Sequence, residues 1–104
     1  MLRLFILCAT IATWPLAVLA KGDIEYGEYL STTCVTCHQL SGTDNGIPSI
    51  VGWDTESFVK TLQSYQAKER DNPVMQMITE PMTTEEMEAL AAYFATIKPV
   101  EVPE

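Results

Sequence analysis

Histidine and basic residues are scarce in this chain of 104 residues. It has one His, and its six Lys and Arg stand against 14 Asp and Glu, so the net charge is −8. Such an acidic balance excludes binding to nucleic acid or to an anionic membrane by charge. It suits a protein partner with a basic docking patch, although simple solubility explains it equally well. With a single His, the chain cannot supply both a metal-ligating histidine and a second, acid–base histidine of the kind used by peroxidases.

Cysteine is also scarce, with three in the chain. Cys8 lies in an apolar N-terminal run and has no assigned role, because Leu7 is too large to precede a lipid-modified cysteine. Cys34 and Cys37 with one His offer too few ligands for a structural zinc site. A thioredoxin-like disulfide between them requires a strand followed by a helix, and the sequence contains no clear alternating strand pattern.

The first twenty residues carry one charge, Arg3, followed by a nearly continuous apolar stretch over 4–19. Val18 and Ala20 are small residues at the positions that signal peptidase prefers. This pattern predicts a secretory signal over 1–20, cleaved after Ala20, and a periplasmic product. An uncleaved membrane anchor is the alternative, and only that would tie the protein to a membrane.

The five residues 34–38 read Cys-Val-Thr-Cys-His, which is the C-x-x-C-H pattern of covalent c-type haem attachment. Two thiols three positions apart on a helical turn, Cys34 and Cys37, can each form a thioether with a vinyl group of the porphyrin. His38 then lies beneath the iron and offers an axial nitrogen. Because the motif occurs once, the chain is expected to carry one covalently bound haem c.

Four stretches are expected to be helical. They are residues 23–33, 56–68, a short helix from Pro73, and a last helix from Thr83 that ends at Lys98-Pro99. Apolar spacing predicts three buried faces, made of Tyr26, Tyr29, Leu30 and Thr33; of Phe58, Leu62 and Tyr65; and of Met87, Leu90, Ala91, Phe94 and Ile97. The all-α domain should therefore cover residues 21–98, with 99–104 as a flexible tail.

Several residues outside the motif are candidates for the haem pocket. The Pro48 carbonyl could accept a hydrogen bond from the other ring nitrogen of His38, which fixes the tautomer of an axial histidine. Alternatively, Pro48 only shapes its loop. Trp53 could reach a haem propionate or serve as an ordinary wall residue. The second axial ligand is open among Met75, Met77 and Met82, because Met87 belongs to the predicted core.

Taken together, these residues resemble class I c-type cytochromes over nearly all of 21–98. In that family two helices cross near the positions of Gly27, Leu30, Leu90 and Tyr93, and Pro48, Ile50 and Gly52 match the segment beneath the haem. The resemblance implies a cytochrome c fold of about four helices around one haem. It also implies that Met75 is the second axial ligand, with Met82 and then Met77 as the alternatives.

Residues 47–94 look most like the small cytochromes of bacterial sulfur oxidation, including the cytochrome subunit of flavocytochrome c sulfide dehydrogenase. The resemblance implies an electron carrier between redox partners rather than an enzyme, because His and Met together saturate the iron. Two alternatives are a haem subunit bound to a flavoprotein sulfide dehydrogenase and a ligand-binding haem protein with a labile distal Met.

Overall fold

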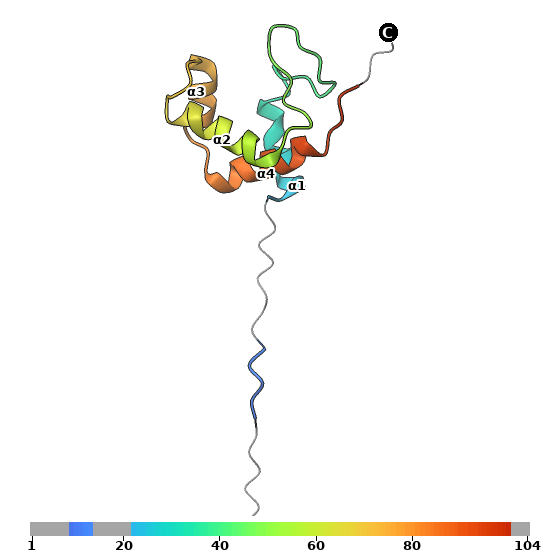
Figure 1. Cartoon of the computed structure of the whole chain (residues 1–104), viewed down its shortest axis with the longest axis vertical. Coiled ribbons are helices and arrows are strands. Elements are labelled where there is room, and N and C mark those ends of the chain that lie inside the picture. Colours follow the sequence, from blue (N-terminus) through green and yellow to red (C-terminus); the bar gives the residue numbers. More distant parts are fainter. Residues whose placement is uncertain (1–8, 14–21, 101–104) are drawn as a thin grey trace, which may run out of the picture.

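The computed structural model describes residues 9–13 and 22–100, which form four α-helices, one 3₁₀ turn and no strand (Figure 1). The helices are α1 (Ile24–Leu30), α2 (Thr55–Gln66), α3 (Pro73–Thr79) and α4 (Thr84–Ala95), and the 3₁₀ turn η1 (Ser31–Thr33) extends α1. The predicted all-α class is confirmed. Most of the predicted export signal lies outside the described residues. No helix within the described ranges is long and apolar enough to cross a membrane.

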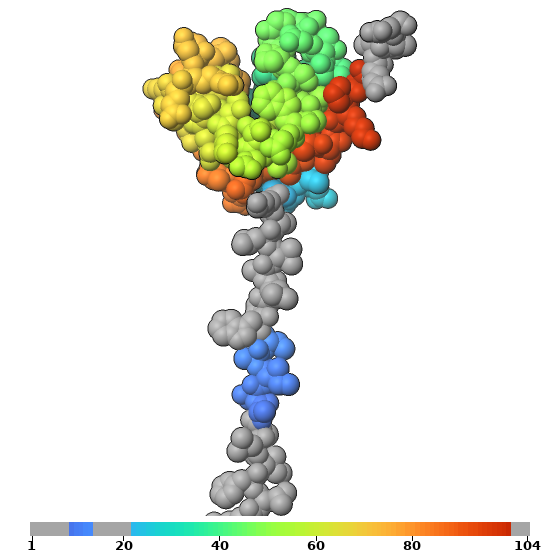
Figure 2. All heavy atoms as spheres, viewed as in Figure 1, coloured from blue at the N-terminus to red at the C-terminus, as the bar shows by residue number. Residues whose placement is uncertain are grey.

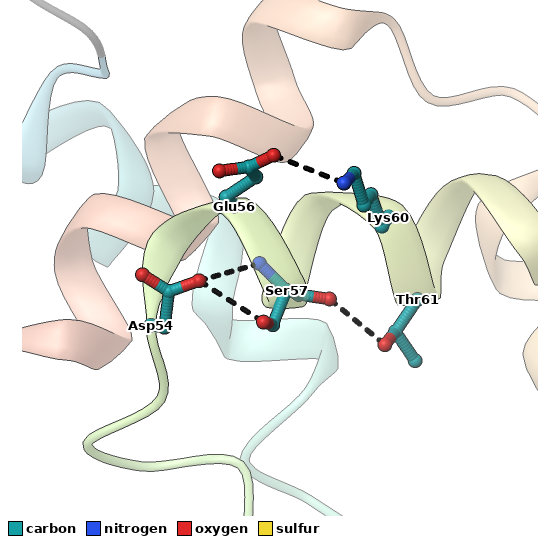
Figure 3. Close-up of polar contacts among 5 residues, drawn as sticks. All are labelled: Asp54, Glu56, Ser57, Lys60 and Thr61. Atoms are coloured by element: carbon teal, nitrogen blue, oxygen red, sulfur yellow. Dashed lines mark hydrogen bonds and ion pairs between the residues drawn. The ribbon is translucent and has the colours of Figure 1, made fainter.

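Local capping chemistry sets where the helices begin. Asp23 accepts a hydrogen bond from the Tyr26 N–H at the start of α1, and Thr83 and Glu86 form a reciprocal capping box at the start of α4. At α2 the Asp54 carboxylate accepts from both the backbone N–H and the hydroxyl of Ser57, at 2.9 and 3.0 Å (Figure 3). Asn72, which the sequence reading did not single out, caps α3 through Met75 N–H.

Helices α1 and α4 cross at a glycine. A Cβ atom added to Gly27 would lie 2.7 Å from the Cβ of Tyr93 and would collide with the backbone carbonyl of Ala89. A missing side chain therefore allows the two helices to approach, as the sequence predicted. This contact joins the two ends of the folded domain.

The predicted buried face of α1 was wrong for Tyr26, Tyr29 and Thr33, which are exposed, whereas Leu30 packs against the core. Tyr29 is 75% exposed and Tyr26 is 36% exposed, whereas Gly27 and Ser31 are buried and Leu30 is half-buried. The physical reason is the close crossing, which requires Gly27 to face α4 and leaves the bulky tyrosines outside.

The hydrophobic core lies between α2 and α4. The Phe58 and Phe94 rings stack with centroids 5.6 Å apart, and Trp53 meets Phe58 edge-on. Met87, Leu90, Ala91 and Phe94 are all buried, as the spacing of the last helix predicted, while Ile97 is half-buried. Residues on one side of α2, together with Leu90 of α4, also line a cavity beside this core.

The described chain continues past the last helix to Val100. The Val100 N–H donates to the Ser41 carbonyl at 3.0 Å, so the loop after the C-x-x-C-H motif is tied to the C-terminal segment. The first two residues of the predicted tail, 99–100, are held in this way, and residues 101–104 lie outside the described part.

Candidate functional site

The C-x-x-C-H residues form a helical turn that continues η1. The N–H groups of Cys37 and His38 both donate to the Cys34 carbonyl, at 3.1 and 2.8 Å. This turn places Cys34, Cys37 and His38 in the lining of one cavity. Cys34 and Cys37 are free thiols in the structure, so the disulfide alternative has no support there. Burial raises the pKa of the Cys34 thiol.

His38 is held by the residue that the sequence indicated. Its Nδ1 lies 2.7 Å from the Pro48 carbonyl oxygen, and because a carbonyl only accepts, Nδ1 is the protonated nitrogen. The lone pair is then on Nε2, which is the arrangement that a metal-ligating histidine requires.

A cavity of about 670 Å³ opens beside this turn. Figure 2 shows the molecule hollowed there, between the loop that carries Pro48 and the α2–α3 part of the chain. Its walls are mainly apolar and aromatic, and include Ile47, Ile50, Trp53, Phe58, Leu62, Tyr65, Val74, Ile78 and Leu90. The volume is within the range of about 300–1,000 Å³ that is typical of small-molecule and cofactor sites.

The three candidate methionines lie in different places. Met75 is half-buried in the first turn of α3 and lines the cavity together with Cys34, Cys37 and His38. Met77 and Met82 line a separate, smaller hollow of about 300 Å³, and Met77 is 64% exposed. Of the three, only Met75 reaches the cavity that holds the His38 imidazole.

Two other residues of the cavity, Trp53 and Arg70, are placed by the structure. The Trp53 indole N–H donates to the Ser49 carbonyl at 3.1 Å, so it supports the loop as a wall residue and is not free for a propionate. Arg70, in the exposed segment after α2, also lines the cavity, and its guanidinium lies 5.6 Å from the Tyr65 ring centroid. The sequence did not predict this placement of Arg70, because an arginine five positions after a tyrosine is not a pattern that indicates contact.

These features fit a haem. The cavity has apolar walls for the porphyrin, thiols for its vinyl groups, an oriented imidazole and a thioether for the iron, and Arg70 as a cation for carboxylates. Within the described ranges, no group of three or more His, Cys, Asp or Glu side chains is placed to hold a metal ion by itself.

An all-α domain with two thiols and an oriented histidine at one cavity defines the class of proteins that carry a covalently attached haem. The family model for cytochrome c matches residues 24–98, and the chain belongs to the cytochrome c family. Its cofactor is therefore haem c, bound covalently.

Two curated relatives carry the name thiosulfate dehydrogenase electron acceptor. The protein from Thiomonas intermedia (strain K12) is 28% identical over 76 residues, which is 70% of this chain and 35% of that protein. The protein from Stutzerimonas stutzeri (strain A1501) is 32% identical over 97 residues, covering 76% of this chain and 45% of that protein. The chain thus spans less than half the length of each of these relatives.

Proposed function

We propose that this protein is a monohaem carrier of single electrons, with His38 and Met75 as axial ligands. The observation that carries the proposal is the meeting of Cys34, Cys37, His38 and Met75 at one apolar cavity. When bound, haem c supplies one-electron exchange between ferric and ferrous iron.

The chain's own residues would hold and tune that group. Cys34 and Cys37 would form the thioether links, and the Pro48 carbonyl would keep His38 in the ligating tautomer. A thioether from Met75 would favour ferrous iron. The apolar walls would exclude water. With His38 and Met75 both bound to the iron, no position would remain for a substrate, so bond-making catalysis is not expected.

Spectroscopy tests the ligand assignment. A pyridine haemochrome spectrum of the purified protein should report one haem with two thioether links. Met75→Ala should abolish the weak long-wavelength band of sulfur-to-ferric-iron charge transfer. Met77→Ala, which changes an exposed methionine two residues later in the same helix, should retain it. Persistence of the band in Met75→Ala would assign the ligand to another methionine.

We further propose that the electron donor is a thiosulfate-oxidising dehydrogenase. The names of the two relatives support this partner class, and the net charge of −8 suits a basic docking patch on it. Rapid reduction of the ferric protein by such an enzyme with thiosulfate is the expected result. Faster reduction by a flavoprotein sulfide dehydrogenase with sulfide would favour the alternative of a flavoprotein-bound haem subunit.

Carbon monoxide separates the carrier from the other alternative, a ligand-binding haem protein. A firmly bound Met75 should make CO binding to the ferrous protein slow and weak. Fast, tight binding would favour a labile distal Met.

The proposed location is the periplasm, which the apolar segment over 4–19 and the small residues before position 21 support. N-terminal sequencing of the haem protein from a periplasmic fraction should begin at Lys21. A sequence that begins at Met1 or a haem protein found only in membranes would support the uncleaved anchor.

A further inference from the structure

Gln66, the last residue of α2, joins that helix to the segment that follows α3. Its Nε2 donates to the carbonyls of Thr79 and Met82, at 2.9 and 2.7 Å, and lies 3.4 Å from the Glu80 carbonyl. A primary amide has two N–H groups, so the two shorter hydrogen bonds use both.

The carbonyls that Gln66 binds need partners. The last carbonyls of a helix have no intrahelical donor, and α3 is seven residues long, so few of its backbone groups are paired within the helix. Thr79 is fully buried, which keeps water from its backbone. The Met82 N–H also donates to the Thr79 carbonyl at 3.0 Å, so Gln66 fixes the turn that ends α3.

This turn is linked to Met75 by another buried hydrogen bond. The Thr79 hydroxyl donates to the Met75 carbonyl at 2.8 Å. At the other end of the helix the Met75 N–H is bound by Asn72. Apolar anchoring of α3 rests on Met75 and Ile78, which are half-buried, because Val74 is 58% exposed and Met77 is 64% exposed. Polar contacts, with Gln66 the one that reaches from another helix to the end of α3, therefore add to what holds the helix in place.

We propose that Gln66 is a positioning residue that keeps the Met75 thioether at the haem face. The inference rests on the proposed function, in which Met75 is the distal ligand. Without the Gln66 amide, the half-buried Met82 carbonyl loses this donor and the buried Thr79 carbonyl keeps only the Met82 N–H, so the end of α3 shifts to find water. Met75 then leaves the cavity more often, and an external ligand gains access.

The test compares haem-loaded Gln66→Leu with haem-loaded Gln63→Leu. Leu is close to Gln in size but has no donor, and Gln63 is an exposed glutamine on the same helix. In Gln66→Leu we expect a weaker sulfur-to-iron band and about tenfold faster CO binding to ferrous protein, the factor that corresponds to the loss of one hydrogen bond. Haem content should be unchanged, and Gln63→Leu should behave as wild type in both measurements.

A wild-type band and CO rate in Gln66→Leu would overturn the proposal. If that variant does not accumulate, Gln66→Glu, which keeps the size but replaces the donor by an acceptor, is judged by the same two readouts. Should neither accumulate while Gln63→Leu does, Gln66 acts in folding and not in ligand position, which also overturns the proposal. Met75→Ala separates failure of the ligand assignment from failure of the Gln66 proposal. If the band remains in Met75→Ala, Met75 is not the ligand. If the band is lost in Met75→Ala but unchanged in Gln66→Leu, Met75 is the ligand and Gln66 does not position it.

Discussion

Lys68 has a φ of +59°, the single positive φ among the described non-glycine residues. It follows Ala67 at the end of α2, where the chain turns toward the segment that carries Arg70 and Met75. Its N–H donates to the Tyr65 carbonyl at 3.0 Å, so the left-handed conformation serves to end the helix. A side chain at this position carries a steric cost that glycine avoids.

Lys68→Gly should therefore stabilise the holoprotein. The relief of left-handed strain is worth about 1 kcal/mol, which denaturant unfolding monitored by far-ultraviolet circular dichroism can resolve. Ala67→Gly, whose backbone is in the ordinary helical region, is the control and should destabilise. Equal effects of the two substitutions would contradict the strain argument.

At the scale of the elements, the crossing of α1 and α4 depends on Gly27. Alanine favours a helix over glycine by about 1 kcal/mol, yet here its Cβ would meet the backbone of Ala89, which has no rotamer to change. Gly27→Ala is expected to be destabilising by about 1–2 kcal/mol net, because overpacking outweighs the propensity gain. Thermal unfolding measures this, with exposed Glu28→Ala as the control. A Gly27→Ala protein that is more stable than wild type would show that the helices cross elsewhere.

The cap of α2 makes a prediction about pH. The hydrogen bonds from the Ser57 backbone and hydroxyl hold the pKa of the Asp54 carboxyl below its usual range (Figure 3). A carboxyl with a lowered pKa in the folded state stabilises the fold above its unfolded pKa, and this stabilisation is lost as the pH falls through the folded pKa. Asp54→Ala should thus lower the melting temperature by a few degrees at neutral pH.

That difference between Asp54→Ala and wild type should shrink in acid, as the wild-type carboxylate becomes protonated. Glu56→Ala is a suitable comparison, since its partner Lys60 forms an exposed ion pair that contributes little. A melting difference for Asp54→Ala that is constant with pH would rule out the charged cap as its cause.

The sequence predicted those elements whose determinants are local. The caps Asp23, Asp54 and Thr83 bind groups three residues away, so spacing along the chain was enough. Gln66 binds carbonyls 13 and 16 positions away, and such pairs leave no periodic signal. The exposed tyrosines of α1 were misplaced because an apolar stripe predicted burial, whereas the approach of α4 is decided by the absence of a side chain at Gly27.

For the site, the C-x-x-C-H motif and Pro48 stood out because their chemistry depends on residue type and order. Three methionines remained equivalent by composition, since a thioether suits both a ligand and a packing gap. It is the tertiary arrangement that places Met75 at the cavity and Met77 and Met82 at another hollow.

At the scale of the whole molecule, a cavity of about 670 Å³ is large for so small a domain. Apolar residues of α2, α3 and the Pro48 loop line that cavity. The haem therefore completes the core, and the haem-free protein is expected to be largely unfolded. Circular dichroism of a Cys34→Ala, Cys37→Ala double variant produced without haem should lack most native helix. A native-like spectrum would mean that the chain closes its core unaided.

Charge acts over the whole surface as well. The net charge of −8 and the carboxylates of haem c should steer a basic partner, so the second-order rate of electron exchange should fall steeply as salt rises from low to physiological concentration. Stopped-flow mixing of the protein with the proposed thiosulfate-oxidising dehydrogenase measures this rate at each salt concentration. A rate that is independent of salt would show that docking relies on apolar contact.

The meeting of Gly27 with Ala89 and Tyr93 has a consequence for biogenesis. A polypeptide that crosses a membrane N-terminus first delivers α1 early and α4 last, so the domain cannot close until translocation is nearly complete. During that interval Cys34 and Cys37 belong to an open chain, and we expect them to be accessible to the enzymes that join them to the porphyrin. In the export that we propose, the late arrival of α4 thus keeps both thiols accessible, and the domain closes once the haem has completed its core.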